Sequence, residues 1–140
     1  MELPEQLLQL SVQRGSILLS DAFEDIDHAK FFAIIGVCDD MIAGFFFINS
    51  RIHPIIMSKP DQFAMQCQLR RQDYDFLRYD SFLAANELQT RPVSALVDSI
   101  KNGLTSIVGQ LTPQDLSAVL EACRNSELFS AKQKRQFFYD

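Results

Sequence analysis

Two apolar runs in the first half of the chain limit its fold more than any other feature. Residues 30–37 read KFFAIIGV and residues 42–49 read IAGFFFIN, and only four residues separate them. Apolar runs of this length with a short connection are typical of a β-hairpin. Successive side chains of a strand point to opposite faces, so both faces of both strands are apolar. We therefore predict that they form the centre of a small, strongly bent sheet or barrel covered on both sides.

Shorter strands are predicted before and after this hairpin. Residues 16–20, SILLS, form one, and residues 21–29 form a loop. Residues 62–70 alternate between apolar and polar side chains, which is typical of a half-exposed strand. Residues 75–84 are predicted to form a further strand.

Two helices are predicted from local boundary signals. Residues 91–103 carry Pro92 near their start and Asn102–Gly103 at their end, so we expect a helix bounded at both ends. A short amphipathic helix is also expected at the N-terminus, after Pro4. Its apolar side chains are Leu3, Leu7, Leu8 and Leu10.

The clearest local signals lie near the C-terminus. Thr112 is a predicted helix N-cap, with Pro113 at the first helical position and Asp115 facing the backbone amides. Such a cap stabilises a helix by about 1 kcal/mol. Ser130 and Gln133 form a predicted capping box for a last helix.

Strands therefore come first and helices last, which predicts an α+β fold. We expect a small β-barrel of about five to six mostly antiparallel strands, an N-terminal helix and C-terminal helices. A chain of 140 residues is expected to form one domain. In that single domain, 1–140, the barrel would span about residues 15–111 and the C-terminal helices about residues 112–140.

Composition excludes several classes of protein. The chain is 47% hydrophobic and contains twelve phenylalanines, which excludes disorder. Its longest apolar runs are far shorter than the roughly 18 residues of a membrane span, so no membrane partner is expected. Acidic residues precede the first leucines, unlike a signal peptide. Three cysteines without a CxxC motif favour free thiols in a reducing compartment, and we expect a cytoplasmic protein.

Motifs for cofactors and metals are absent from the sequence. It has no glycine-rich phosphate loop, HExxH, paired CxxC or GxSxG. The acidic residues 21–27 lack the glycine that a calcium-binding loop requires. We therefore expect neither a metal site nor a cofactor.

The distribution of charge is uneven. The net charge is −5, which argues against a broad surface for a polyanion. Residues 21–27 hold four of the acids, whereas Arg70, Arg71 and Arg78 lie close together in the sequence. Such charge runs usually form solvated faces, but a local basic groove is the alternative.

Polar side chains directly follow the second hairpin strand. Asn49, Ser50, Arg51 and His53 leave the end of a buried strand, where a rigid scaffold holds loop residues in place. Metal-free RNA cleavage needs a cation for the phosphate charge, a base for the 2′-hydroxyl and an acid for the leaving oxygen. Arg51 fits the first role, His53 either of the others, and Ser50 a hydrogen bond to phosphate. The alternative is that Asn49 and Ser50 only cap the strand and Arg51 is solvated.

Two further features bear on nucleic-acid binding. His28 precedes one central strand and His53 follows the other, so both imidazoles could lie on one rim; the alternative is two ordinary loop histidines. Residues 70–82, RRQDYDFLRYDSF, interleave aromatic and basic side chains, which suits stacking on single-stranded RNA. At strand spacing such tyrosines also commonly fill a sheet edge.

Five short segments carry a resemblance to a known family. They are Gly15–Leu18, Lys30–Ile35, Ile48–Ser50, Ser81–Leu83 and Val108–Leu116. Their order and composition resemble the MazF/PemK family of toxin ribonucleases, whose fold is an SH3-like barrel with appended helices. The most specific match, within the last segment, is similar to the family's turn into its C-terminal helix. The resemblance covers roughly residues 15–124.

The resemblance implies a metal-independent endoribonuclease that cleaves single-stranded RNA. It further implies a toxin held in check by a cognate antitoxin protein. We also expect a homodimer, because small barrels with exposed edge strands tend to pair or cover them. In the family an arginine and a threonine or serine flank the cleaved phosphate, and the matching positions here are Lys30 and Ser50. These two positions, the polar residues that follow the second hairpin strand, and residues from the segment 70–82 give two sets of candidates. The catalytic set is Lys30, Ser50, Arg51 and His53, and the substrate-binding set is Asn49, Arg70, Arg78 and Ser81.

A second hypothesis is that the protein has the same fold but does not cleave RNA. Lys30 stands where the family has an arginine, and a lysine lacks the bidentate fork that grips a phosphate. The acidic residues 21–27 also lie where family members contact RNA. These departures favour a catalytically inactive SH3-like barrel that acts as a protein-interaction module.

Overall fold

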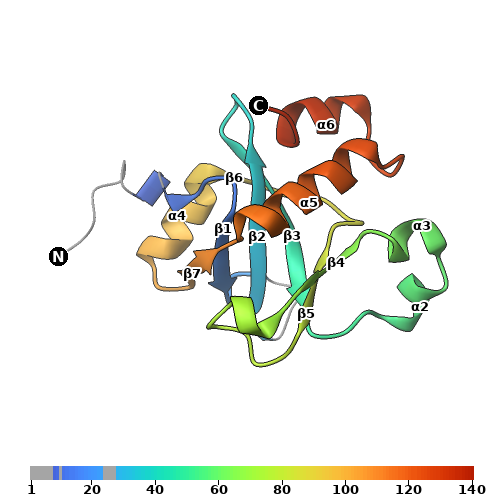
Figure 1. Ribbon diagram of the computed structural model, residues 1–140. Coiled ribbons are helices and arrows are strands. Elements are labelled where there is room, and N and C mark those ends of the chain that lie inside the picture. The colour runs from blue at the N-terminus through green and yellow to red at the C-terminus, as the bar shows by residue number, and fades with distance from the viewer. Residues whose placement is uncertain (1–7, 10, 24–27) are drawn as a thin grey trace.

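The computed structural model describes residues 8–9, 11–23 and 28–140, and these contain one seven-stranded sheet (Figure 1). The order along the sheet is β4-β5-β3-β2-β1-β7, and β6 pairs with β3 as well. Every strand pair is antiparallel. The strands are β1 Ser16–Ser20, β2 Lys30–Val37, β3 Ile42–Asn49, β4 Gln66–Leu69, β5 Ser81–Ala84, β6 Gln89–Pro92 and β7 Thr105–Gln110. This is the α+β, small-barrel architecture that the sequence predicts.

Helices lie on both faces of the sheet. In Figure 1, α5 crosses in front of β2 and β3, whereas α4 lies on the other side. The helices are α2 Pro54–Met57, α3 Pro60–Phe63, α4 Val93–Lys101, α5 Pro113–Asn125 and α6 Ala131–Phe137, with a 3₁₀ turn at Arg71–Asp73. The strands predicted at residues 16–20, 30–37 and 42–49 are observed with the same bounds, as β1, β2 and β3. The last two are long apolar runs with a short connection, which leaves few alternatives to a hairpin.

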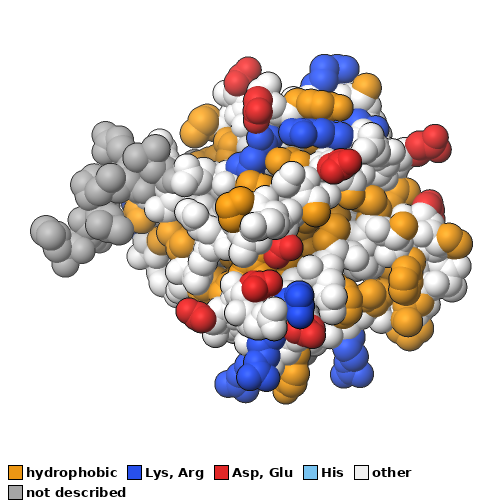
Figure 2. All heavy atoms as spheres, in the orientation of Figure 1, with side chains coloured by type: hydrophobic (Ala, Val, Ile, Leu, Met, Phe, Trp, Pro, Cys, Tyr) orange, Lys and Arg blue, Asp and Glu red, His pale blue; other side chains and the backbone are white. Residues whose placement is uncertain are grey.

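The two short helices α2 and α3 form an arm that stands apart from the sheet. Each is one turn long, each begins at a proline, and neither contains a buried residue. Ile55, Met57 and Phe63 are its exposed large hydrophobic side chains. Figure 2 shows apolar side chains gathered over this arm, at the lower right.

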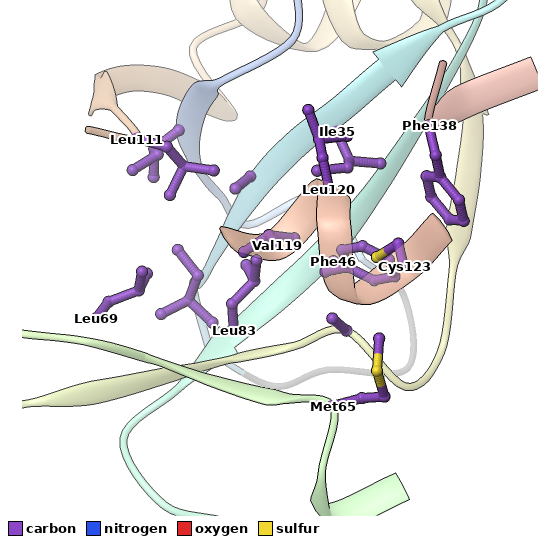
Figure 3. Packing of buried hydrophobic residues seen from close by; sticks show 14 of the residues in the cluster. Ile35, Phe46, Met65, Leu69, Leu83, Leu111, Val119, Leu120, Cys123 and Phe138 are labelled. Atoms are coloured by element: carbon purple, nitrogen blue, oxygen red, sulfur yellow. The ribbon is translucent and has the colours of Figure 1, made fainter. Parts of the chain in front are cut away.

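The first hydrophobic cluster lies between the sheet and the C-terminal helices. Ile35 of β2 and Phe46 of β3 face Val119, Leu120 and Cys123 of α5 (Figure 3). Phe46 and Cys123 are completely buried. Because α5 carries its apolar residues at helical spacing, one side of it closes this face of the sheet.

The second cluster covers the opposite face. Phe32 and Phe45, which alternate with the residues of the first cluster, pack against α4 through Leu96 and Val97. The rings of Phe32 and Phe45 have their centroids 4.7 Å apart. Both faces of the central hairpin are therefore covered, as its unbroken apolar sequence predicts.

Both predicted helix caps near the C-terminus are confirmed. The Thr112 hydroxyl accepts a hydrogen bond from the Asp115 backbone N–H at 3.2 Å. The Ser130 hydroxyl accepts one from the Gln133 N–H at 3.1 Å, and the Gln133 side chain accepts one from the Ser130 N–H at 2.9 Å. These bonds satisfy amides that the first turn of a helix leaves unpaired.

Several predicted boundaries are wrong. The strand predicted at 62–70 covers only Gln66–Leu69, because Pro60 starts the helix that contains Phe63. The strand predicted at 75–84 is likewise limited to Ser81–Ala84.

The helix predicted at 91–103 is correct in place but begins at Val93, since residues 91–92 end β6. The strands β6 and β7 and the helices α2 and α3 were not predicted. Residues 1–7, 10 and 24–27, with three leucines of the predicted N-terminal helix and most of the acidic loop, lie outside the described residues.

The C-terminal residues are held against the start of the chain. Arg14 donates hydrogen bonds to the carbonyl oxygens of Ile35, Phe137 and Tyr139 at 2.8, 3.0 and 3.1 Å. Its guanidinium also pairs with the Asp140 carboxylate at 2.7 Å. Gly36 permits this close approach, because a Cβ there would lie 2.1 Å from the Phe137 carbonyl oxygen.

Candidate functional site

A cleft of about 860 Å³ opens where the ends of β2, β3 and β5 meet the α2–α3 arm. Its wall contains every predicted site residue except Arg70, and also contains both histidines. The residues of interest in the wall are His28, Lys30, Asn49, Ser50, Arg51, His53, Gln66, Phe76, Arg78, Tyr79, Ser81, Asn86 and Gln89.

The sheet register explains why these residues meet. Phe31 of β2 lies opposite Ile48 of β3, so Lys30 at the start of β2 lies beside Asn49 at the end of β3. Asn49 in turn lies opposite Phe82 of β5. The polar residues that enter or leave these strands therefore share one edge of the sheet.

Lys30 is fixed on the floor of the cleft. Its Nζ donates a hydrogen bond to Asn49 Oδ1, and it lies 5.5 Å from the centroid of the Phe47 ring. Burial lowers the pKa of Lys30 below the ordinary value, because a half-buried ammonium loses part of its hydration. The side chain thus presents a partly desolvated cation held in one position.

Ser50 and Arg51 follow this pair on the exposed rim. Both side chains are exposed, and neither has a hydrogen bond or ion pair with another described residue. An unpaired guanidinium in the same cleft as a fixed ammonium is suited to binding an anion such as phosphate.

His53 lies at the N-terminus of α2. Its Nδ1 accepts a hydrogen bond from the Ile55 backbone N–H at 3.1 Å, so the imidazole is the N-cap of this helix. A neutral imidazole that accepts at Nδ1 carries its proton on Nε2. The hydrogen bond to Ile55 therefore occupies Nδ1 and leaves Nε2 as the ring nitrogen with no partner inside α2.

The other predicted substrate-binding residues differ in their placement. Arg78 is exposed in the cleft wall, whereas Arg70 lies outside the wall. Ser81 is only 4% exposed, and its hydroxyl donates to the Tyr79 carbonyl oxygen at 2.9 Å. A hydroxyl that is already engaged in this way contributes less to binding than an exposed one.

The charge of the cleft wall is opposite in sign to that of the chain. Among its described residues Lys30, Arg51 and Arg78 are positive and Glu87 is negative, a balance of +3 − 1 = +2. The whole chain carries −5. Figure 2 shows lysine and arginine side chains along the lower edge of the molecule, below β4 and β5. The described part of the cleft wall is thus basic on an acidic protein, which favours the local basic groove that the sequence left open as an alternative.

The same wall contains an amide pair that was not predicted. Gln66 Nε2 donates to Asn86 Oδ1 at 2.8 Å, and Asn86 Nδ2 donates to Gln62 Oε1 at 3.4 Å. The alternation of residues 62–70 predicts that Gln66 points away from the core. Its partner follows β5, however, and no local signal links the two positions.

Among the described residues, no three His, Cys, Asp or Glu side chains gather where they could hold a metal ion. The described helices also include none with the length and apolar character needed to cross a membrane.

Comparison with known proteins gives one informative result. No protein-family model and no curated protein sequence matches the chain. Among solved structures, the Mycobacterium tuberculosis toxin MazF-mt6 is similar, with a TM-score of 0.51 and 16% sequence identity. The match covers 80% of this chain and 94% of that toxin. The chain has a MazF-like fold.

At this level of identity the likeness concerns the arrangement of the backbone. The family resemblance noted in the sequence is therefore confirmed at the level of the fold.

Proposed function

We propose that this protein is an endoribonuclease toxin that cleaves single-stranded RNA without a metal ion. One observation supports this most strongly: the edge shared by β2 and β3 brings Lys30, Asn49, Ser50 and Arg51 into one basic cleft. This grouping supplies the cations and hydroxyl that a phosphodiester requires, on the MazF-like fold.

In the proposed reaction the RNA 2′-oxygen attacks the adjacent phosphorus. The O2′–P bond forms, the P–O5′ bond breaks, and the products are a cyclic 2′,3′-phosphate and a 5′-hydroxyl. Arg51 and Lys30 neutralise the charge that develops on the phosphate oxygens. Ser50 and the Nε2–H of His53 donate hydrogen bonds to the same group.

Two protons must move in this reaction. The 2′-hydroxyl loses one to solvent, which reaches the open cleft. Burial lowers the pKa of Lys30 and so makes its ammonium a stronger acid. We assign to Lys30 the transfer of a proton to O5′ as that oxygen leaves.

The proposal includes the biological setting that the resemblance implies. We propose a cytoplasmic toxin that forms a homodimer and is inhibited by a cognate antitoxin protein. Asn49 and Arg78 would bind the RNA beside the reacting phosphate. Ser81 would shape that part of the wall, and Arg70 would act only on RNA that extends beyond the cleft.

A catalytically inactive protein-interaction module is the second candidate. The arm formed by α2 and α3 supports it, since Ile55 and Met57 are 58% and 55% exposed and neither helix has a buried residue. Apolar side chains exposed in this way are common at protein interfaces.

Cleavage of a mixed-sequence single-stranded RNA in EDTA tests the proposal. We expect the wild-type protein to cleave, and Arg51→Ala and Ser50→Ala to lose at least about a hundredfold in rate. Arg135→Ala, an exposed arginine of α6 outside the cleft wall, is the matched control and should cleave normally. No cleavage at high protein concentration would overturn the nuclease and favour the interaction module.

A further inference from the structure

The cleft wall contains a second, uncharged group of polar side chains. Gln66 lies at the start of β4 and Asn86 follows β5. Gln66 pairs with Ala84, and Leu83 pairs with the buried Ile48. Because side chains alternate, Gln66 and Ala84 lie on the same face of the sheet as Asn49. Ala84, whose side chain is small, lines the same cleft as the two amides and the basic residues.

Hydrogen bonds hold the amide of Gln66 in one orientation. Its Nε2 donates both protons, one to Asn86 Oδ1 at 2.8 Å and one to the Gln62 carbonyl oxygen at 3.3 Å. Asn86 Nδ2 uses one proton on Gln62 Oε1. Among the described residues, Gln66 Oε1 therefore remains available as an acceptor and Asn86 Nδ2 as a donor. Both side chains are half-buried, which limits their freedom to rotate away.

A fixed acceptor beside a fixed donor matches the hydrogen-bonding edge of a nucleobase. Single-stranded RNA is read by hydrogen bonds to such edges and by stacking of the base on aromatic rings. Tyr79, which is 65% exposed, lines the same cleft and supplies a ring for stacking. The wall thus has a basic part suited to phosphate and a neutral part suited to a base.

We propose that Gln66 and Asn86 form a nucleobase-binding subsite and that Gln66 determines which base the cleft prefers. The inference rests on the proposed function, since it takes single-stranded RNA as the ligand. It adds a specificity-determining pair to the residues that contact the phosphate.

Binding to non-cleavable RNA tests this subsite apart from catalysis. The probes are fluorescent 2′-O-methyl hexanucleotides with a single base, A, C, G or U, among abasic positions, and the fully abasic chain. Gln66→Met removes both hydrogen-bonding groups but keeps the length of the side chain. Gln68→Met is the matched control, because Gln68 lies on the same strand and face but outside the cleft wall.

We expect the wild-type protein to bind one base-bearing probe about tenfold more tightly than the abasic chain. Gln66→Met should remove this preference and leave the affinity for the abasic chain unchanged, whereas Gln68→Met should change neither. Asn86→Ala should also remove the base preference. The double variant Gln66→Met/Asn86→Ala should show no further loss, because the two amides act as one unit.

Three outcomes would count against the subsite. A base preference that survives in Gln66→Met would overturn it, and so would equal wild-type affinity for all five probes. Failure of the wild-type protein to bind any RNA would remove the proposed function and the subsite together. A wild-type protein that binds with a base preference but does not cleave natural RNA would overturn the nuclease and support the subsite.

Discussion

Lys30 and Asn49 join the ends of the two central strands through a hydrogen bond from Nζ to Oδ1. The bond holds an ammonium group above the ring of Phe47, at the floor of the basic cleft. Asn49 is therefore a positioning residue for Lys30, in addition to any contact of its own with RNA.

Asn49→Ala should lower kcat/KM for RNA cleavage by about tenfold, because a hydrogen bond to a charged group contributes about 1.5–3 kcal/mol. Since Lys30 would then sample other positions, Asn49→Gln should restore part of the rate. Steady-state cleavage measures the effect, with Asn125→Ala at the exposed end of α5 as the control. A loss of similar size in the control would show that the effect is not specific to the cleft.

The lowered pKa of Lys30 predicts how RNA binding depends on pH. The ammonium contributes to binding only while it is charged, so affinity should fall as pH rises through this lowered pKa, before an ordinary exposed lysine would lose its proton. Lys30→Arg keeps its charge throughout and should bind with little change over the same range. Fluorescence anisotropy with a 2′-O-methyl RNA measures both proteins, and identical pH profiles would contradict the assignment.

The fold could be predicted where the signal is local. The apolar hairpin and the caps at Thr112 and Ser130 depend on residues close in the sequence, and all three were predicted. In contrast, β7 contains Gly109 and exposed polar residues, and it is a strand because it pairs with β1, which lies far away in the sequence. A strand of this kind has no periodic pattern of its own.

The candidate site shows the same division. His28 and His53 could be predicted on one rim, because they flank two strands of one hairpin, and both line the cleft. Lys30 became a candidate through the family resemblance. The contact between Gln66 and Asn86 could not be predicted, since it depends on the pairing of β4 with β5. The role of His53 as a helix N-cap was also beyond prediction, because α2 is a single turn whose only strong signal is Pro54.

Two cysteines should resist alkylation in the native protein. Burial, and then the negative charge of Asp115, raises the pKa of Cys67 to about 11. Burial, and then the neighbouring Cys67, raises the pKa of Cys123 to about 12. Because the thiolate is the reactive form, both should remain unmodified by iodoacetamide at about pH 8 while Cys38 reacts. Mass spectrometry with and without urea is the test, and rapid native labelling of Cys123 would contradict the packing of α5.

Tyr74→Phe should destabilise the protein by about 1–3 kcal/mol at neutral pH. The Tyr74 hydroxyl donates to Asp115 Oδ2 and accepts from the Thr112 backbone N–H at 3.1 Å, so it links residue 74 to the start of α5. Urea unfolding measures the loss, and Tyr79→Phe, at an exposed ring, should be neutral.

The same tyrosine predicts the sign of an alkaline effect. Burial, and then the bond to Asp115, raises the pKa of Tyr74. Its contribution to stability is complete below the ordinary tyrosine pKa and is lost as pH rises through the raised value. The difference in unfolding free energy between wild type and Tyr74→Phe should therefore shrink at high pH, and a difference that grows would refute the assignment.

Gly36→Ala should destabilise the protein by about 1–3 kcal/mol, because the added Cβ would meet the Phe137 backbone and displace the end of α6. Thermal unfolding followed by circular dichroism measures the change. In a chain truncated after Ser130 the substitution should cost much less, since the clashing residue is gone. An equal cost in both chains would place the strain elsewhere.

The contacts of Arg14 cannot form until the C-terminal residues of the chain have been synthesised. Its carbonyl acceptors at Phe137 and Tyr139 are synthesised 123 and 125 residues after Arg14 itself. Until then Phe46 lacks Phe129 and Phe138, which pack on it in the finished protein. A nascent chain therefore lacks these partners of Phe46, on one face of β3, until synthesis is almost complete, and a prematurely terminated chain keeps that apolar face exposed and is prone to aggregate.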